Sequence, residues 1–205
     1  MARFLMTQTL LSSWAYMFNC YDGCEDDAKA DFLRTLNREK VEPTKAMQDG
    51  IAFEREVYRQ ATGYPRTPHK DWESGIKAVA THVSGAQFQV KAQRELTVCG
   101  MDFLCYGILD GLRAGQIFDV KYKEKSFGSL DLAGSYLDSA QHPMYFYLVP
   151  EAYEFQYLVS DGTDLYIETY HPNECRSIEE IVTDFVKSIT DMGLLPVYLE
   201  KWAAK

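Results

Sequence analysis

The 205-residue sequence lacks any apolar run of about 18 residues, the length that a membrane-spanning helix requires. The longest apolar runs are short; MYFYLV, for example, is followed by Pro150 and Glu151. We therefore expect a soluble, cytoplasmic protein without a membrane partner. Residues 1–18 place an arginine before an apolar stretch, but a TQT segment interrupts that stretch and no small-residue cleavage site is clear. We expect this segment to be a helix of the mature fold.

The sequence also lacks paired cysteines. Its five cysteines are an odd number and include no CxxC motif, which argues against a disulfide framework or a zinc ribbon and fits a reducing compartment. Cys20 and Cys24 are four residues apart and could share a helix face. An iron–sulfur cluster needs four ligands placed together, and the other three cysteines are scattered. We expect no cluster and interpret the cysteines as small buried side chains.

Positive charge is scarce. The chain has 21 Lys and Arg against 30 Asp and Glu, a net charge of −9, whereas nucleic-acid-binding proteins usually carry a basic face. This composition disfavours a nucleic-acid partner without excluding one. A local basic groove can exist on an acidic protein, and acids that bind a divalent metal add to the negative count before the metal is bound.

The remaining composition, 46% hydrophobic and 14% aromatic, is that of an ordinary globular protein, and the length suits one domain spanning residues 1–205. The patterns predict an α+β (α/β/α-like) fold, in which helices flank a central mixed β-sheet. Residues 73–84 fit a short helix or an irregular segment equally well. The predicted elements are helices at 9–20, 26–36, 44–63 and 130–149, an antiparallel meander at 88–98, 101–113 and 116–124, a hairpin at 153–172, and a capped helix at 177–193.

Two neighbouring strands of the meander carry charged residues in otherwise apolar surroundings. Asp110 ends the strand FLCYGIL, and Asp119 and Lys121 lie two residues apart on the next strand, so they point to the same face. If the strands pair around the RAG turn, the three side chains converge. Two carboxylates brought together repel each other unless a hard cation neutralises them, and oxygen ligands favour Mg²⁺ or Mn²⁺ over zinc. The alternative is an ordinary ion pair on a strand face, because DVK is a common tripeptide.

The order of the surrounding motifs resembles the core of the PD-(D/E)XK nuclease superfamily, and in particular its RecB-like branch, which includes phage exonucleases. The motifs are GIAFE with Glu54 ahead of the sheet, GILDG with Asp110, the Asp119–Lys121 tripeptide, and QHPMY with Gln141 and Tyr145. The resemblance implies a restriction-endonuclease-like fold in which the meander carries the site. It covers most of residues 10–147.

The resemblance assigns a role to each acidic or basic residue of these motifs. Asp110 and Asp119 would bind the metal, with the carbonyl of Val120 as a further ligand and Glu54 completing the site. Lys121 would position the water or stabilise the phosphate in the transition state.

The helix after the meander supplies two more residues. Gln141 and Tyr145 would contact substrate or brace the site, although Tyr145 fits a core aromatic and Gln141 a surface amide equally well. His142 matches no ligand of the family and is expected to be a surface or structural histidine. Arg113, Lys123 and Lys125 would form a local basic groove or a solvated strand face.

Two functions follow from the resemblance. The first is a Mg²⁺- or Mn²⁺-dependent deoxyribonuclease, an exonuclease of phage or mobile-element origin that acts in recombination or repair, with DNA as partner and with a helicase or a single-strand annealing protein beside it. The second is a catalytically inactive protein of the same fold that binds nucleic acid or inhibits another protein. The acidic charge favours the second, and the set of three acids with Lys121 favours the first.

Overall fold

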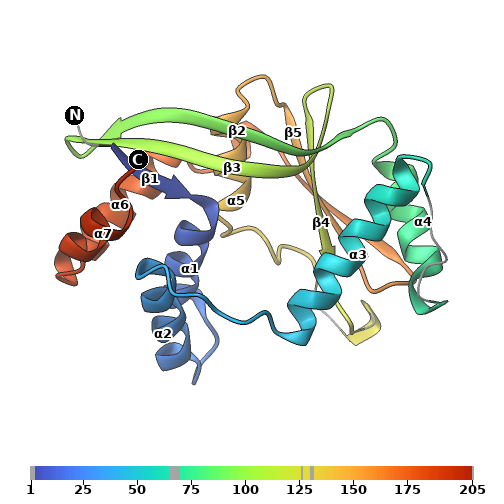
Figure 1. Ribbon diagram of the computed structural model, residues 1–205, viewed down its shortest axis with the longest axis horizontal. Helices are drawn as coiled ribbons and strands as arrows, with labels where there is room; N and C mark the ends of the chain where they lie inside the picture. The colour runs from blue at the N-terminus through green and yellow to red at the C-terminus, as the bar shows by residue number, and fades with distance from the viewer. Residues whose placement is uncertain (1–2, 65–69, 126, 130–131, 205) are drawn as a thin grey trace.

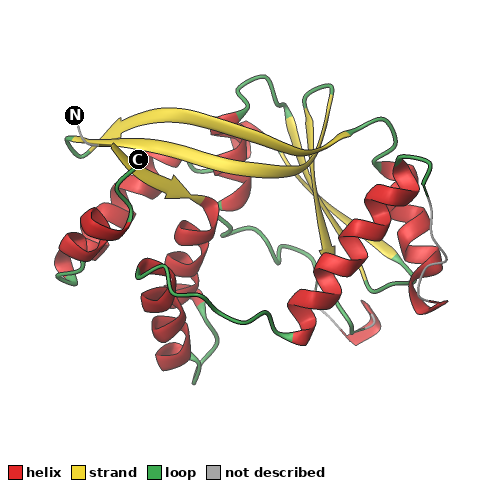
Figure 2. Cartoon of the chain, viewed as in Figure 1, coloured by secondary structure: helices red, strands yellow, loops and turns green. Residues whose placement is uncertain are grey.

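The structure is a computed structural model that describes residues 3–64, 70–125, 127–129 and 132–204. Its helices and strands form a mixed α+β architecture, with a six-stranded sheet and helices on both sides (Figures 1 and 2). The elements are β1 (Arg3–Thr7), α1 (Gln8–Asn19), α2 (Glu25–Leu36), α3 (Lys45–Ala61), α4 (Glu73–His82), β2 (Gln87–Val98), β3 (Met101–Arg113), β4 (Gln116–Tyr122), α5 (Gln141–Leu148), β5 (Glu154–Ser160), β6 (Leu165–Tyr170), α6 (Ile178–Asp191) and α7 (Leu195–Lys201).

Strand β3 is the centre of the sheet because it pairs with three other strands. Strand β2 runs antiparallel along nearly the whole of β3 and takes up one of its edges. The other edge is shared, since β1 pairs in parallel with residues 102–106 and β4 pairs antiparallel with residues 111–113. The sheet then continues from β4 to β5 and β6. Residues 107–110 of β3 thus lie between the two partners, at a point we call the fork.

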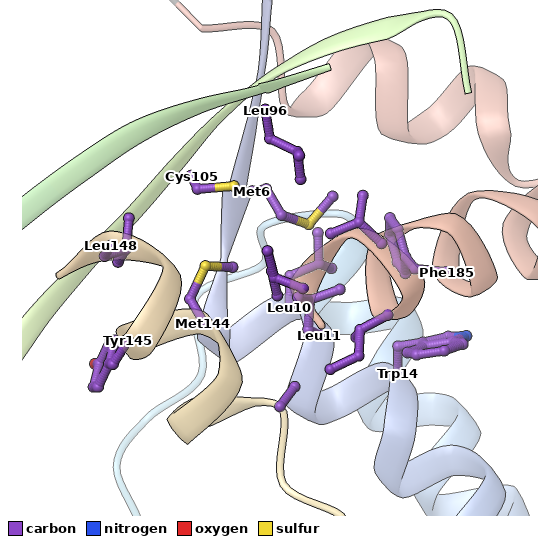
Figure 3. Packing of buried hydrophobic residues seen from close by; sticks show 14 of the residues in the cluster. Met6, Leu10, Leu11, Trp14, Leu96, Cys105, Met144, Tyr145, Leu148 and Phe185 are labelled. Carbon is purple, nitrogen blue, oxygen red and sulfur yellow. The ribbon is translucent and has the colours of Figure 1, made fainter. Parts of the chain in front are cut away.

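The two faces of the sheet are covered by different hydrophobic clusters. The larger one packs α1, α5 and α6 against the sheet, with residues such as Leu10, Met144 and Phe185 at its centre (Figure 3). The smaller one packs α3 and α4 against β4 and β5. Neighbouring residues of β4 point to opposite faces, because Ile117 belongs to the larger cluster and Phe118 to the smaller. The fork therefore lies between two packed layers.

Most predicted elements are present, and the expected meander is confirmed as β2, β3 and β4. The predicted capping box is also present, since Ser177 accepts from the backbone of Glu180 and the Glu180 side chain accepts in return. Residues 73–82 form the helix α4 where the sequence left helix and irregular structure equally open. None of the described helices is long and apolar enough to cross a membrane.

Two expectations about helices were wrong. The first residues are not wholly helical, because residues 3–7 form β1, whose backbone pairs with β3 and whose residue Leu5 donates to the carbonyl of Trp202. The helix expected over 130–149 begins only at Gln141, with residues 130 and 131 outside the described part of the chain. Before it the backbone makes successive turns, one of them at Gly134 with φ +74°, a conformation that no helix continues. Helix α7 was not predicted.

Candidate active site

Asp110 lies at the fork and pairs with neither β2 nor β4. On one edge, pairing with β4 begins only at the next residue, Gly111. On the other edge, β2 pairs with the residues on either side of Asp110 but not with Asp110 itself. The backbone N–H of Val120 donates to Oδ2 of Asp110 at 3.1 Å. A side-chain carboxylate thus takes the place of a missing backbone acceptor where β4 leaves β3, which fixes the orientation of Asp110.

Asp119 and Lys121 project from β4 on the same face, as the strand alternation predicted. Asp119 is 2% exposed, and its Oδ2 lies 2.7 Å from Nζ of Lys121. Its Oδ1 accepts a hydrogen bond from the amide of Gln141 on α5. Oδ2 is buried, and its partner among the described residues is the ammonium group of Lys121, in an ion pair. The carboxylate of Asp119 therefore has a partner at each of its oxygens.

Glu54 approaches the fork from α3. Its Oε1 accepts from the hydroxyl of Tyr58, one turn further along the helix, and from Nε2 of Gln89 on β2 at 3.0 Å. The sequence motifs did not single out Tyr58 or Gln89. Tyr58 could have been found from its i, i+4 spacing to Glu54, whereas nothing in the strand pattern marks Gln89.

The charges of these residues perturb one another. Burial, followed by repulsion from Asp119 and Glu54, raises the pKa of Asp110 well above its ordinary range. Burial also raises the pKa of Glu54, although the hydrogen bond from Tyr58 opposes that shift. Burial alone would lower the pKa of Lys121, but the carboxylates of Asp119 and Asp110 outweigh it and hold that pKa above its usual value. We refer to Glu54, Asp110, Asp119 and Lys121 as the acid cluster.

Helix α5 braces the acid cluster through two of the predicted residues. Gln141 is 6% exposed and binds Asp119, as described above. Tyr145 is 5% exposed, and its hydroxyl donates to the carbonyl of Ile108 at 2.9 Å, inside the fork. Gly107 permits this approach, since a Cβ there would lie 2.5 Å from Cε1 of Tyr145. Both side chains thus contact the protein itself in the way that the bracing interpretation expects.

His142, the residue between them on α5, belongs to a different polar group. Its Nδ1 lies 3.1 Å from the hydroxyl of Tyr157, and its ring stacks on Tyr170 at 4.1 Å. The hydroxyl of Tyr170 donates to Glu168, which also accepts from the backbone N–H of Tyr136. Burial lowers the pKa of His142 to about 4. We refer to His142, Tyr157, Glu168 and Tyr170 as the histidine cluster.

The basic residues near the site have different surroundings. The guanidinium group of Arg113 donates to the carbonyls of His82 and Ser84 and lies over the ring of Phe118 at 5.0 Å, so Arg113 ties β3 to the end of α4. Lys123 lies 5.5 Å from the ring of Tyr136, next to the acid cluster. Arg113 is therefore held by these contacts, whereas Lys123 contacts an aromatic ring.

The donor set of the acid cluster suits a hard cation held by few protein ligands. Within residues 3–64, 70–125, 127–129 and 132–204, no group of three or more His, Cys, Asp or Glu side chains has the geometry of a metal site. Asp110 and Asp119 nevertheless offer two repelling carboxylates, with Lys121 paired to Oδ2 of Asp119. Mg²⁺ is commonly bound through one or two carboxylates, with water and substrate phosphate filling its other positions. The residues present fit that type of site and not a closed cage.

Comparisons with known proteins bear on the fold. No protein-family model matches the sequence, and no curated protein matches it significantly. A solved structure described as "Crystal structure of SSO0001" is similar with a TM-score of 0.51 at 13% identity, covering 93% of this chain and 76% of the other. A second, "Crystal Structure of LHK-Exo in complex with dAMP", has a TM-score of 0.49 at 10% identity, covering 96% and 89%. Together with the observed sheet and flanking helices, the first similarity confirms the predicted restriction-endonuclease-like α+β fold.

Proposed function

We propose that this protein is a Mg²⁺- or Mn²⁺-dependent nuclease that hydrolyses phosphodiester bonds in DNA. The observation that carries the proposal is the close approach of Asp110, Asp119 and Glu54, whose mutual repulsion is opposed by the ammonium group of Lys121 at 2.7 Å from Oδ2 of Asp119. Buried charges are usually paired, and one ammonium group does not neutralise three carboxylates, so the cluster supports a further ligand that is positively charged.

Asp110 and Asp119 would hold the cation, with the carbonyl of Val120 as a further ligand, and Glu54 would adjust the site from α3 as an outer carboxylate. When bound, Mg²⁺ or Mn²⁺ supplies a Lewis acid that lowers the pKa of water and neutralises charge on a phosphate oxygen. Asp110 is held in place by the N–H of Val120, so its carboxylate stays oriented as substrate arrives.

Lys121 supplies a second positive charge beside the carboxylates. Its Nζ forms an ion pair with Asp119, and the ammonium form is favoured because neighbouring carboxylates raise the pKa of Lys121. In substrate-bound protein this group would hydrogen-bond a phosphate oxygen, where negative charge increases in the transition state. Gln141 donates to Oδ1 of Asp119, while Oδ2 faces Lys121. Tyr145 maintains the fork through the carbonyl of Ile108.

The finer proposal is an exonuclease of phage or mobile-element origin that acts in recombination or repair, together with a helicase or a single-strand annealing protein. It is supported by the ordered motifs around Glu54, Asp110, Asp119 and Gln141, which resemble the RecB-like branch. The alternative, an inactive protein of the same fold, is favoured by the net charge of −9, which repels a DNA backbone at long range.

Cleavage assays separate these two functions. Purified protein is incubated with labelled single- and double-stranded DNA in Mg²⁺, Mn²⁺ or EDTA, beside Asp119→Asn and Lys121→Gln. We expect metal-dependent cleavage that EDTA abolishes and that each substitution lowers by more than about 10²-fold.

The matched controls are Asp191→Asn and Lys187→Gln, which make the same chemical changes at exposed positions of α6. Both controls should cleave like the wild type. Cleavage that persists in EDTA, or that survives both substitutions in the acid cluster, would rule the nuclease out.

A further inference from the structure

Gln89 has a backbone conformation that is unusual for its position. Its φ is +55°, in the left-handed region that non-glycine residues rarely adopt. The other described non-glycine residues with positive φ are Arg38, which follows the end of α2, and Cys99 and Ala114, each of which precedes a glycine in a hairpin turn. Among these four, only Gln89 lies inside a strand, and a turn therefore does not explain its conformation.

The pairing between β2 and β3 is interrupted at the same position. Phe88 pairs with Gly111 and Val90 pairs with Leu109, but Gln89 does not pair with Asp110, which lies opposite. The register is the same on both sides of the interruption, so no residue has been inserted as in a β-bulge. The distortion is a local change of backbone conformation, and it occurs directly across from a residue of the acid cluster.

The side chain of Gln89 uses this conformation to reach α3. Its Nε2 lies 3.0 Å from Oε1 of Glu54 and 3.2 Å from the hydroxyl of Tyr58. The ring of Tyr58 in turn packs on Phe88, with 4.5 Å between centroids. Gln89 and Tyr58 both donate to Oε1 of Glu54, so they fix the rotation of that carboxylate without occupying Oε2.

A left-handed conformation disfavours folding for a residue with a Cβ, and glycine would adopt it at little cost. Strain of this kind persists where the surrounding structure holds it and is often found at functional sites. Here the strained residue is exposed, so packing of its own side chain does not hold it. The contact that it gains is the one to Glu54 and Tyr58.

We propose that Gln89 is a positioning residue that orients the Glu54 carboxylate toward a divalent cation bound by Asp110 and Asp119, and that β2 keeps its strained backbone for this purpose. The inference rests on the proposed function, because it concerns the same metal site. Donors that orient a metal ligand typically change metal affinity by 10- to 100-fold when they are lost.

The test compares stability with metal binding, both without DNA. The melting temperature is measured in EDTA, and Mn²⁺ binding is measured from the paramagnetic resonance signal of free Mn²⁺. Gln89→Gly should raise the melting temperature by about 2 to 4 °C, because it relieves the strain, and should weaken Mn²⁺ binding about tenfold. Gln89→Met keeps the side-chain length and the strain but lacks the donor, so it should weaken Mn²⁺ binding without the gain in melting temperature.

Gln93→Gly is the matched control. Gln93 lies on the same strand, is exposed, and pairs normally with Tyr106. Glycine there should lower the melting temperature and leave Mn²⁺ binding unchanged. If wild-type protein binds Mn²⁺ and Gln89→Gly binds it equally well, the inference is overturned and the proposed function stands. If wild-type protein binds no Mn²⁺, both are overturned.

Discussion

The acid cluster and the histidine cluster are both largely buried and polar, and both receive a residue from the same turn of α5. Gln141 reaches the acid cluster and His142 the histidine cluster. In the histidine cluster the contacts are complementary: a neutral imidazole stacks on Tyr170, and the carboxylate of Glu168 accepts from a hydroxyl and a backbone N–H. In the acid cluster three carboxylates repel one another, and Lys121 is the one cation of the cluster that opposes them.

The difference supports the acid cluster as the proposed cation site. A polar network whose donors and acceptors match can stabilise a core by itself, whereas repelling carboxylates lower stability until something positive joins them. A buried histidine next to Gln141 is a conceivable catalytic base. The hydrogen bond and ring contacts of His142, however, are with Tyr157, Tyr170 and Phe155, none of which belongs to the acid cluster. We therefore assign the histidine cluster to the fold.

The largest expected effect is that of Asp110→Asn on cleavage. Asparagine keeps an acceptor for the N–H of Val120 but removes a proposed metal ligand, so cleavage should fall by more than about 10²-fold. The same change relieves repulsion with Asp119 and Glu54, and the protein in EDTA should become more stable to urea. His142→Phe is the comparison variant and should keep its activity per folded molecule. If the Asp110→Asn protein keeps its cleavage activity, the acid cluster would be no more important for activity than the histidine cluster.

The second prediction concerns the pH dependence of stability in EDTA, which should have opposite signs for the two clusters. The pKa of His142 is lowered to about 4. Its contribution to the free energy of unfolding is therefore complete above pH 6.5 and is lost as the pH falls toward 4. This difference corresponds to about 3 kcal/mol. The pKa of Asp110 is raised. Ionised Asp110 therefore destabilises the folded state fully above that pKa, and this destabilisation disappears as the pH falls toward 3.8.

Urea unfolding of wild type, His142→Phe and Asp110→Asn between pH 4 and 7.5 measures both slopes. The advantage of wild type over His142→Phe should shrink with falling pH, and so should the advantage of Asp110→Asn over wild type. As the pH falls, the free energy of unfolding of wild type should therefore decrease relative to His142→Phe and increase relative to Asp110→Asn. If the stability of wild type instead changes in the same direction relative to both variants, the charges assigned to His142 and Asp110 are wrong.

Much of the acid cluster could be predicted from the sequence because it depends on local geometry. Strand alternation puts Asp119 and Lys121 on one face, and the turn between β3 and β4 brings Asp110 close to them. The helical spacing of Gln141 and Tyr145 likewise puts them on one side of α5. The partners of these residues, Asp119 and the carbonyl of Ile108, depend on how α5 packs, which no local pattern contains.

The elements that sequence reasoning missed depend on distant contacts. Strand β1 is short and precedes a helix without a break, and its pairing with β3 determines its conformation. Gln89 has the alternation of an ordinary exposed strand residue, so its left-handed backbone is visible only in the structure. Both are cases in which tertiary contacts override local preference.

A smaller effect is expected from Glu168→Gln in the histidine cluster. Hydrogen bonds to a charged acceptor contribute about 1.5 to 3 kcal/mol each, so neutralising Glu168 should lower the free energy of unfolding by about 2 kcal/mol. Urea denaturation at pH 7.5 measures this, with Glu151→Gln as the exposed control, for which a change below about 0.5 kcal/mol is expected. A stabilised Glu168→Gln protein would show that this cluster also contains uncompensated charge, and the comparison would weaken.

The smallest effect is expected from Tyr145→Phe, which tests how α5 supports the fork. The hydroxyl of Tyr145 is the partner of the Ile108 carbonyl at the fork, and its loss should lower the free energy of unfolding by about 1 kcal/mol. Tyr147→Phe is the control on the same helix, because its hydroxyl binds the carbonyl of Glu95 in an exposed position, where water replaces it readily. A larger loss for Tyr145→Phe than for Tyr147→Phe would support the fork as a separately maintained feature. Equal losses would mean that the carbonyl of Ile108 finds water instead, and that the position of Asp110 depends on the N–H of Val120 rather than on α5.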